Sequence, residues 1–78
     1  PGWFPKKEKT LDKWRESYAV IKDRRKLYSQ EYEDGTTDEP NPHIDDLQDA
    51  LAAESMWKKK PSQSTVSRIM KAGDEGWF

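Results

Sequence analysis

The hydrophobic positions of this chain follow helical spacing, and the longest such stretch begins at Leu11. It continues by alternating steps of three and four residues, with Arg25 in the one slot that lacks an apolar side chain. The stripe consists of Leu11, Trp14, Tyr18, Ile21, Tyr28 and Tyr32. Side chains at this spacing share one face of an α-helix. Thr10 offers a hydroxyl for the N-cap and Asp12 an acid for the first turn, so we expect a long amphipathic helix over 10–32.

An acidic loop and a second helix are expected next. Asp34 and Gly35 mark a turn, and residues 33–41 are polar, acidic and contain a proline. Asn41 suits an N-cap and Pro42 suits the first helical position. The buried stripe of this helix is Ile44, Leu47 and Leu51. These features predict a helix over about 42–54.

A third helix is expected over about 62–72. Ser62 provides the N-cap, and Gly73 is expected to stop the helix at its C-terminal end. Its inward face consists of Val66, Ile69 and Met70. Between the second and third helices, the side chains of Met56 and Trp57 are expected to pack into the core.

Composition indicates one small all-α domain, because 78 residues with 32% hydrophobic and 37% charged side chains can bury only a modest core. We expect an extended lead-in over 1–9 and a C-terminal helix-turn-helix-like unit over 42–78, with the first helix as a packing brace. The shared core is predicted to contain Trp14, Tyr18, Ile21, Leu47, Leu51, Val66 and Ile69. Gly-Trp-Phe occurs near both ends of the chain, so both ends are expected to cover this core unless the repetition is a coincidence.

The net charge of −1 hides a strong segregation of charge along the chain. Residues 6–26 carry nine Lys and Arg among four acids, residues 31–54 carry nine acids and no Lys or Arg, and residues 58–71 carry five basic residues and no acid. Local fields decide where an anion docks, so the last segment is the candidate for binding one.

Several classes of function are not expected. The chain has no cysteine for disulfides or thiolate metal sites, and no apolar run long enough for a membrane helix. His43 with Asp45, Asp46 and Asp49 could suggest a metal site, but first-turn acids explain that cluster better. With a single histidine and no glycine-rich phosphate loop, we expect neither catalysis nor a cofactor. The chain begins at Pro1 without an initiator Met, so we expect a processed form or a segment of a longer protein.

The third helix has a polar face typical of DNA reading. Short hydrogen-bonding groups let a helix approach base edges closely, and Gln63 and Arg68 can bond adenine and guanine through two hydrogen bonds each. Lysines just upstream suit backbone phosphates. The candidate DNA contacts are Lys58, Lys59, Lys60, Ser62, Gln63, Ser64, Thr65, Arg68 and Lys71.

The run Ser62–Met70 also resembles the recognition-helix signature of mariner-like and related insertion-sequence transposases, and more loosely that of pogo-type and centromere-protein-B-type domains. The likeness covers about the last 35 residues and is specific at Ser62–Met70. It implies a helix-turn-helix that inserts its second helix into the major groove. It further implies a parent protein such as a transposase, recombinase or transcription regulator, located with DNA in a nucleus or nucleoid.

The expected partner is therefore double-stranded DNA. One alternative is a protein-interaction module that uses the aromatic first helix and the acidic loop over 31–46. A further alternative is RNA binding through stacking on Trp and Tyr.

Overall fold

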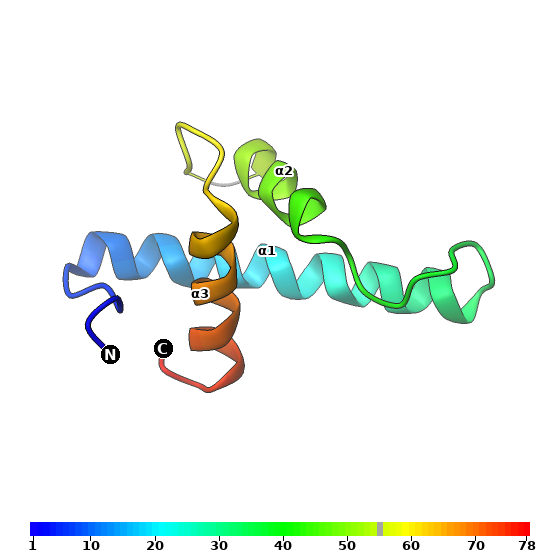
Figure 1. Ribbon diagram of the computed structural model, residues 1–78, viewed down its shortest axis with the longest axis horizontal. Helices are drawn as coiled ribbons and strands as arrows, with labels where there is room; N and C mark the ends of the chain where they lie inside the picture. Colours follow the sequence, from blue (N-terminus) through cyan, green and yellow to red (C-terminus); the bar gives the residue numbers. More distant parts are fainter. Residues whose placement is uncertain (55) are drawn as a thin grey trace.

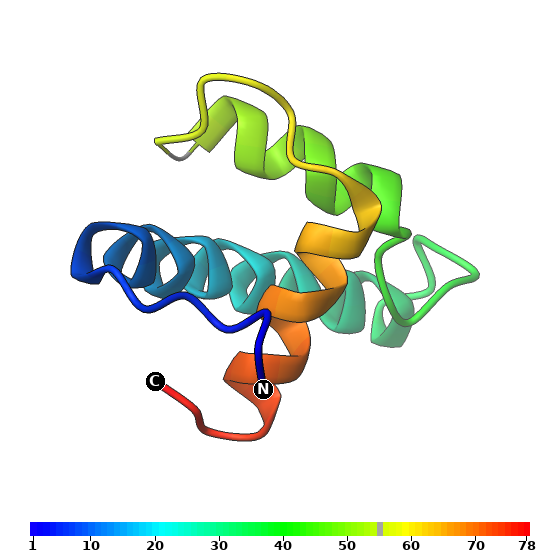
Figure 2. The same cartoon turned by 60° about the vertical axis from the view of Figure 1, so that its left-hand side comes forward.

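In the computed structural model, which describes residues 1–54 and 56–78, three helices pack against one another. They are α1 (Glu8–Glu33), α2 (Ile44–Glu54) and α3 (Gln63–Asp74). In Figure 1, α1 lies along the long axis of the molecule, α3 crosses it steeply, and α2 packs beside both. The far end of α1 extends beyond α3 in both views (Figures 1 and 2). The all-α prediction with three helices is thereby confirmed.

The predicted core is confirmed in full. Ile21, Leu51, Val66 and Ile69 have no exposed surface, and Tyr18 packs against them while partly buried. Trp14 and Leu47 are also buried in the same cluster. Each helix contributes residues of the stripe that its three-and-four spacing predicts, because burying these stripes together removes apolar surface from water. The prediction is wrong at the end of the first stripe, where Tyr32 is 50% exposed.

The two chain ends cover the same part of the core, as the repeated tripeptide suggested. The rings of Trp3 and Trp77 stack with centroids 5.3 Å apart, and those of Phe4 and Phe78 stack at 6.2 Å. The termini consequently lie close together beside α1 and α3 (Figure 2). The lead-in is partly a turn and not fully extended, since the Phe4 N–H donates to the Pro1 carbonyl at 3.2 Å.

Two predicted helix starts are wrong. The first helix begins at Glu8 after Lys7, whose side chain makes no capping bond, so Thr10 lies inside the helix. Glu8 in the first turn complements the positive end of the helix dipole. The second helix begins at Ile44, and the carbonyl of His43 accepts its first helical bond, from Leu47. Asn41 and Pro42 therefore belong to the preceding loop.

The ends of the first and third helices also differ from expectation. The first continues to Glu33 and is followed by the turn at Asp34 and Gly35, where Gly35 has a φ of 78°. The third continues past Gly73 to Asp74, and the glycine with a positive φ, 74°, is Gly76. Gly73 is thus not a stop.

The connection between α2 and α3, residues 55–62, is longer than the three- to four-residue turn of a standard helix-turn-helix. Trp57 is partly buried against the core, as predicted. Met56 is 55% exposed, so its predicted role in the core is wrong. The ring of Trp57 already covers the edge of the core between α2 and α3.

Candidate nucleic-acid interface

The face of α3 that the sequence singled out is open to solvent. Val66, Ile69 and Ala72 point into the core. The outer side carries five exposed side chains between the start of the helix and its last turn, which are Gln63, Ser64, Ser67, Arg68 and Lys71. Thr65 is only partly exposed. Because α3 buries one side against α1 and α2, its polar side is left free to meet a partner.

Ser62 caps α3 as predicted. Its Oγ accepts a hydrogen bond from the Thr65 N–H at 3.2 Å and donates one to the Thr65 hydroxyl at 3.0 Å. It also lies 3.2 Å from the Ser64 hydroxyl. The hydroxyls of Ser62 and Thr65 are thus engaged with each other, which leaves Gln63, Arg68 and Lys71 as the longer reaching groups on this face.

The two basic side chains of α3 each have a contact of their own. The Arg68 guanidinium lies 5.9 Å from the centre of the Trp3 ring, within range of a cation–π interaction. The Lys71 ammonium lies 3.4 Å from a carboxylate oxygen of Glu75, one turn further on. Both contacts are at the surface and worth little energy, so neither prevents these side chains from turning to an anion.

Upstream of α3, the three consecutive lysines border a groove of about 500 Å³. Two lysines of α1 line the same groove, although they lie far away in the sequence. The five lysines are Lys9, Lys13, Lys58, Lys59 and Lys60. Among the described residues that line it there is no acid, and the hydroxyl-bearing Ser62 and Thr65 complete its wall. We call this feature the lysine groove.

Trp57 contributes to the apolar lining of the lysine groove and is hydrogen-bonded to α1. Its indole N–H donates to the hydroxyl of buried Ser17 at 2.7 Å, and that hydroxyl donates in turn to the Lys13 carbonyl, also at 2.7 Å. The Lys13 ammonium lies 4.0 Å from the centre of the Trp57 ring. The base of the groove is therefore tied to α1, because the indole N–H and the Ser17 hydroxyl are both hydrogen-bonded.

One lysine of the groove is already paired. The Lys60 ammonium lies 2.9 Å from a carboxylate oxygen of Asp49 on α2. Within the described part of the chain, Lys58, Lys59 and Lys9 form no ion pair. The groove thus holds several cations that have no ion-pair partner among residues 1–54 and 56–78.

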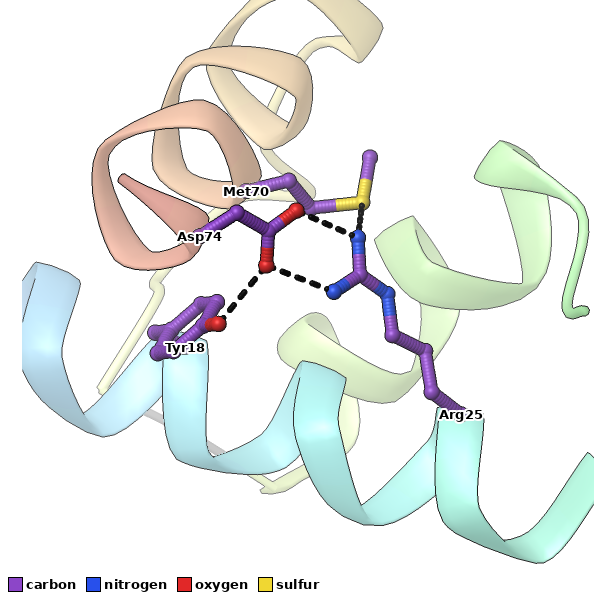
Figure 3. Close-up of polar contacts among 4 residues, drawn as sticks. All are labelled: Tyr18, Arg25, Met70 and Asp74. Carbon is purple, nitrogen blue, oxygen red and sulfur yellow. Dashed lines mark hydrogen bonds and ion pairs between the residues drawn. The ribbon is translucent and has the colours of Figure 1, made fainter. Parts of the chain in front are cut away.

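The C-terminal end of α3 is fastened to α1 by a network of polar contacts (Figure 3). The Arg25 guanidinium donates to both oxygens of the Asp74 carboxylate, at 2.8 and 3.1 Å, and to the Met70 sulfur at 3.1 Å. The Tyr18 hydroxyl donates to the same carboxylate at 2.7 Å. The bonds from Arg25, and then from Tyr18, lower the pKa of Asp74, and the bond to Asp74 raises the pKa of Tyr18. This network helps to fix the direction in which α3 presents its polar face.

The histidine and aspartates considered for a metal site have other partners. His43 pairs with Glu39, and Asp49 pairs with Lys60. Asp46 accepts a hydrogen bond from the Tyr28 hydroxyl at 2.6 Å, and this bond lowers the pKa of Asp46. In the described ranges, no three such side chains are grouped so that they could hold a metal ion.

Lys9 and Lys13 are the interface candidates that sequence reasoning did not select. The excess of basic residues over 6–26 indicated that α1 could bind an anion. It did not show which of these residues lie at the lysine groove, because most of them lie outside its lining. Only the packing of residues 56–61 against the start of α1 shows which two join Lys58, Lys59 and Lys60.

Comparisons of the chain with protein-family models, with curated proteins and with solved structures find no match. Within the described residues, none of the helices combines the length and the apolar character needed to cross a membrane.

Proposed function

We propose that this chain is a DNA-binding domain in which α3 enters the major groove and reads base edges. The observation that carries the proposal is the exposed polar face of α3, which lies beside Lys58 and Lys59, two lysines that form no ion pair within the described residues. Gln63 and Arg68 provide the two-bond geometries that distinguish adenine and guanine. Lys58, Lys59 and Lys71 provide charges for phosphates on either side of the helix.

The way α3 is held supports this proposal. A reading helix must keep its side chains in register with the bases, so it has to be fixed to its scaffold. Val66 and Ile69 are fully buried, Ser62 caps the start of the helix, and Asp74 ties its end to Arg25. The helix is rigid on its inner side and open on its outer side.

The similarity of Ser62–Met70 to transposase recognition helices adds to the proposal and bears on the parent protein. We infer that the domain serves as the DNA-reading part of a transposase, a recombinase or a transcription regulator. Such a protein acts on DNA in a nucleus or nucleoid.

The second candidate is a protein-interaction module, and one observation favours it. At the far end of α1, Leu27 is 44% exposed and Tyr32 is 50% exposed, beside the acidic loop. Trp14 and Tyr18, however, pack into the core and are not available to a partner. The apolar surface left on α1 is therefore small, which makes this the weaker candidate.

A titration of labelled duplex DNA at low and at moderate salt tests the proposal. We expect binding that weakens steeply as salt rises, because lysine–phosphate contacts release counterions. A single-stranded RNA of the same length serves as the comparison and should bind less tightly. If no duplex binds at low salt, the DNA-binding proposal fails and the protein-interaction module becomes the better supported function. If the RNA binds more tightly than the duplex, stacking on exposed aromatic rings becomes the better account.

A further inference from the structure

The lysine groove gathers cations from two segments that are distant in the sequence. Lys9 and Lys13 come from the first turns of α1, and Lys58 and Lys59 come from the connection to α3. Like charges brought together repel one another, so a folded chain that gathers them loses stability until an anion is present. The groove is therefore complementary to a ligand with several negative oxygens.

The chemistry of the walls favours phosphate among such ligands. The start of α3 borders the groove, where Ser62 and Thr65 form part of the wall. The positive end of the α3 dipole therefore adds to the field of the lysines. Flexible ammonium groups bind the charge of a phosphate without demanding one fixed geometry. The partly apolar base formed by Trp57 can take the sugar of a nucleotide chain.

The lysine groove lies next to the exposed polar face of α3. Ser62, which caps α3, and Thr65 in its first turn both line the groove, and Gln63 between them is exposed. When α3 enters the major groove of a duplex, a phosphodiester strand runs along the edge of the major groove. This strand passes next to the start of α3.

We propose that the lysine groove is a phosphate-binding site that holds this phosphodiester strand, with Lys9 and Lys13 of α1 as two of its ligands. The role as a backbone clamp rests on the DNA-binding function proposed above. In this arrangement α1 does more than brace α3. It forms the second wall of the site that positions the duplex.

The salt dependence of duplex binding tests the assignment of Lys9 and Lys13. The double variant Lys9→Gln/Lys13→Gln should lower affinity for every duplex sequence alike. The slope of log affinity against log salt should shrink by about two units, roughly one for each lysine that no longer meets a phosphate. The control is Lys22→Gln/Lys26→Gln, which removes the same charge from α1 outside the groove and should leave the slope near that of the parent. Equal slopes for the groove variant and the parent would overturn the proposal, as would an equal reduction of the slope in the control.

A second measurement separates the groove from the wider DNA-binding proposal. Tripolyphosphate is added to the intact chain while the indole N–H signals are followed by NMR. The Trp57 signal should move most, because that indole lines the groove and lies under the Lys13 ammonium. The movement should be much smaller in Lys9→Gln/Lys13→Gln.

The outcomes of the two measurements are distinguishable. A Trp57 response to tripolyphosphate without any duplex binding would refute the proposed function while supporting a phosphate site. Duplex binding with no Trp57 response and an unchanged salt slope would refute the groove while supporting the proposed function. An Asp/Glu-rich peptide that moves the Trp57 signal at lower concentration than tripolyphosphate would overturn the phosphate assignment and point to an acidic protein segment.

Discussion

Gly73 of α3 and Tyr18 of α1 are packed so closely that no side chain fits between them. A Cβ built on Gly73 would lie 2.2 Å from Cδ1 and 2.4 Å from Cγ of the Tyr18 ring. The ring is held from its other end by the hydrogen bond to Asp74. The glycine therefore marks the point where α3 crosses α1, and it sets how near the two helices come.

Gly73→Ala should destabilise the domain even though alanine is the better helix former. The gain in helix propensity is about 1 kcal/mol. The clash must be relieved by moving a ring near its attachment to the backbone, and overpacking of this kind costs about 1–3 kcal/mol, to which disruption of the Tyr18–Asp74 bond adds. We expect a lower thermal midpoint. Gly2→Ala is the control, because a Cβ there meets nothing within 4 Å, and its midpoint should match the parent. A Gly73→Ala midpoint at or above that of the parent would contradict this account.

The apolar stripes were predictable because their spacing alone determines which residues share a helix face. The core residues from Trp14 to Ile69 follow from that spacing. A glycine carries no such pattern: at Gly73 the sequence permits either a helix stop or a close helix crossing, and only the position of Tyr18 decides. The capping error at Asn41 has a similar origin, because Pro42 fits a loop as well as a first helical turn.

The candidate interface was predictable only where its residues lie close together in the sequence. The exposed face of α3 and the cap at Ser62 follow from one helical segment. The pairing of Lys60 with Asp49 and the approach of Lys9 and Lys13 depend on tertiary packing. Arg25 occupied the one gap in the apolar stripe, and its role there became clear only from Asp74, which lies at the far end of the chain.

The Asp74 network should make stability depend on pH. The bonds from Arg25 and Tyr18 lower the pKa of Asp74 below its ordinary 3.8, so the folded state favours the carboxylate. Its stabilising contribution is fully present above pH 3.8 and is lost as the pH falls through the lowered pKa. Because the side chain is 47% exposed, we expect a contribution under about 1 kcal/mol.

Chemical unfolding at a series of pH values below about 5 checks this expectation. Asp74→Asn should be less stable than the parent near neutral pH and should lose less stability on acidification. Tyr18→Phe keeps Arg25, the larger cause of the shift, so it should retain most of the acid sensitivity. Parallel curves for the parent and Asp74→Asn would show that the network does not contribute. Some acid sensitivity should remain in both variants, because the bond from Tyr28 lowers the pKa of Asp46 as well.

Asp49→Asn should strengthen DNA binding. The Asp49 carboxylate holds Lys60 at 2.9 Å and competes with phosphate for it. Exposed ion pairs are worth about 0.2–1 kcal/mol, so release of Lys60 should raise the affinity by up to about fivefold at low salt. Fluorescence anisotropy with a labelled duplex measures the change. Asp23→Asn removes the same charge from α1 and controls for the general effect of net charge. A rise of equal size in both variants would assign the effect to net charge and not to Lys60.

The sharpest prediction concerns Arg68, because it separates base reading from a merely basic surface. The side chain is exposed on α3, and its guanidinium lies 5.9 Å from the centre of the Trp3 ring, so Arg68→Ala should change the thermal midpoint little. If Arg68 bonds a guanine through two hydrogen bonds, the substitution should cost about 1–3 kcal/mol on the preferred duplex and far less on a random one. The preferred duplex is first selected from a random pool with the parent protein, and all variants are then compared at one salt concentration.

Arg68→Lys keeps the charge but not the planar fork, so it should lose most of the preference while retaining affinity for random duplex. Arg15→Ala removes an arginine from α1, outside α3 and the lysine groove, and should leave the preference intact. Equal losses of affinity for Arg68→Ala on both duplexes, with full rescue by Arg68→Lys, would make Arg68 a phosphate contact and leave base reading to Gln63.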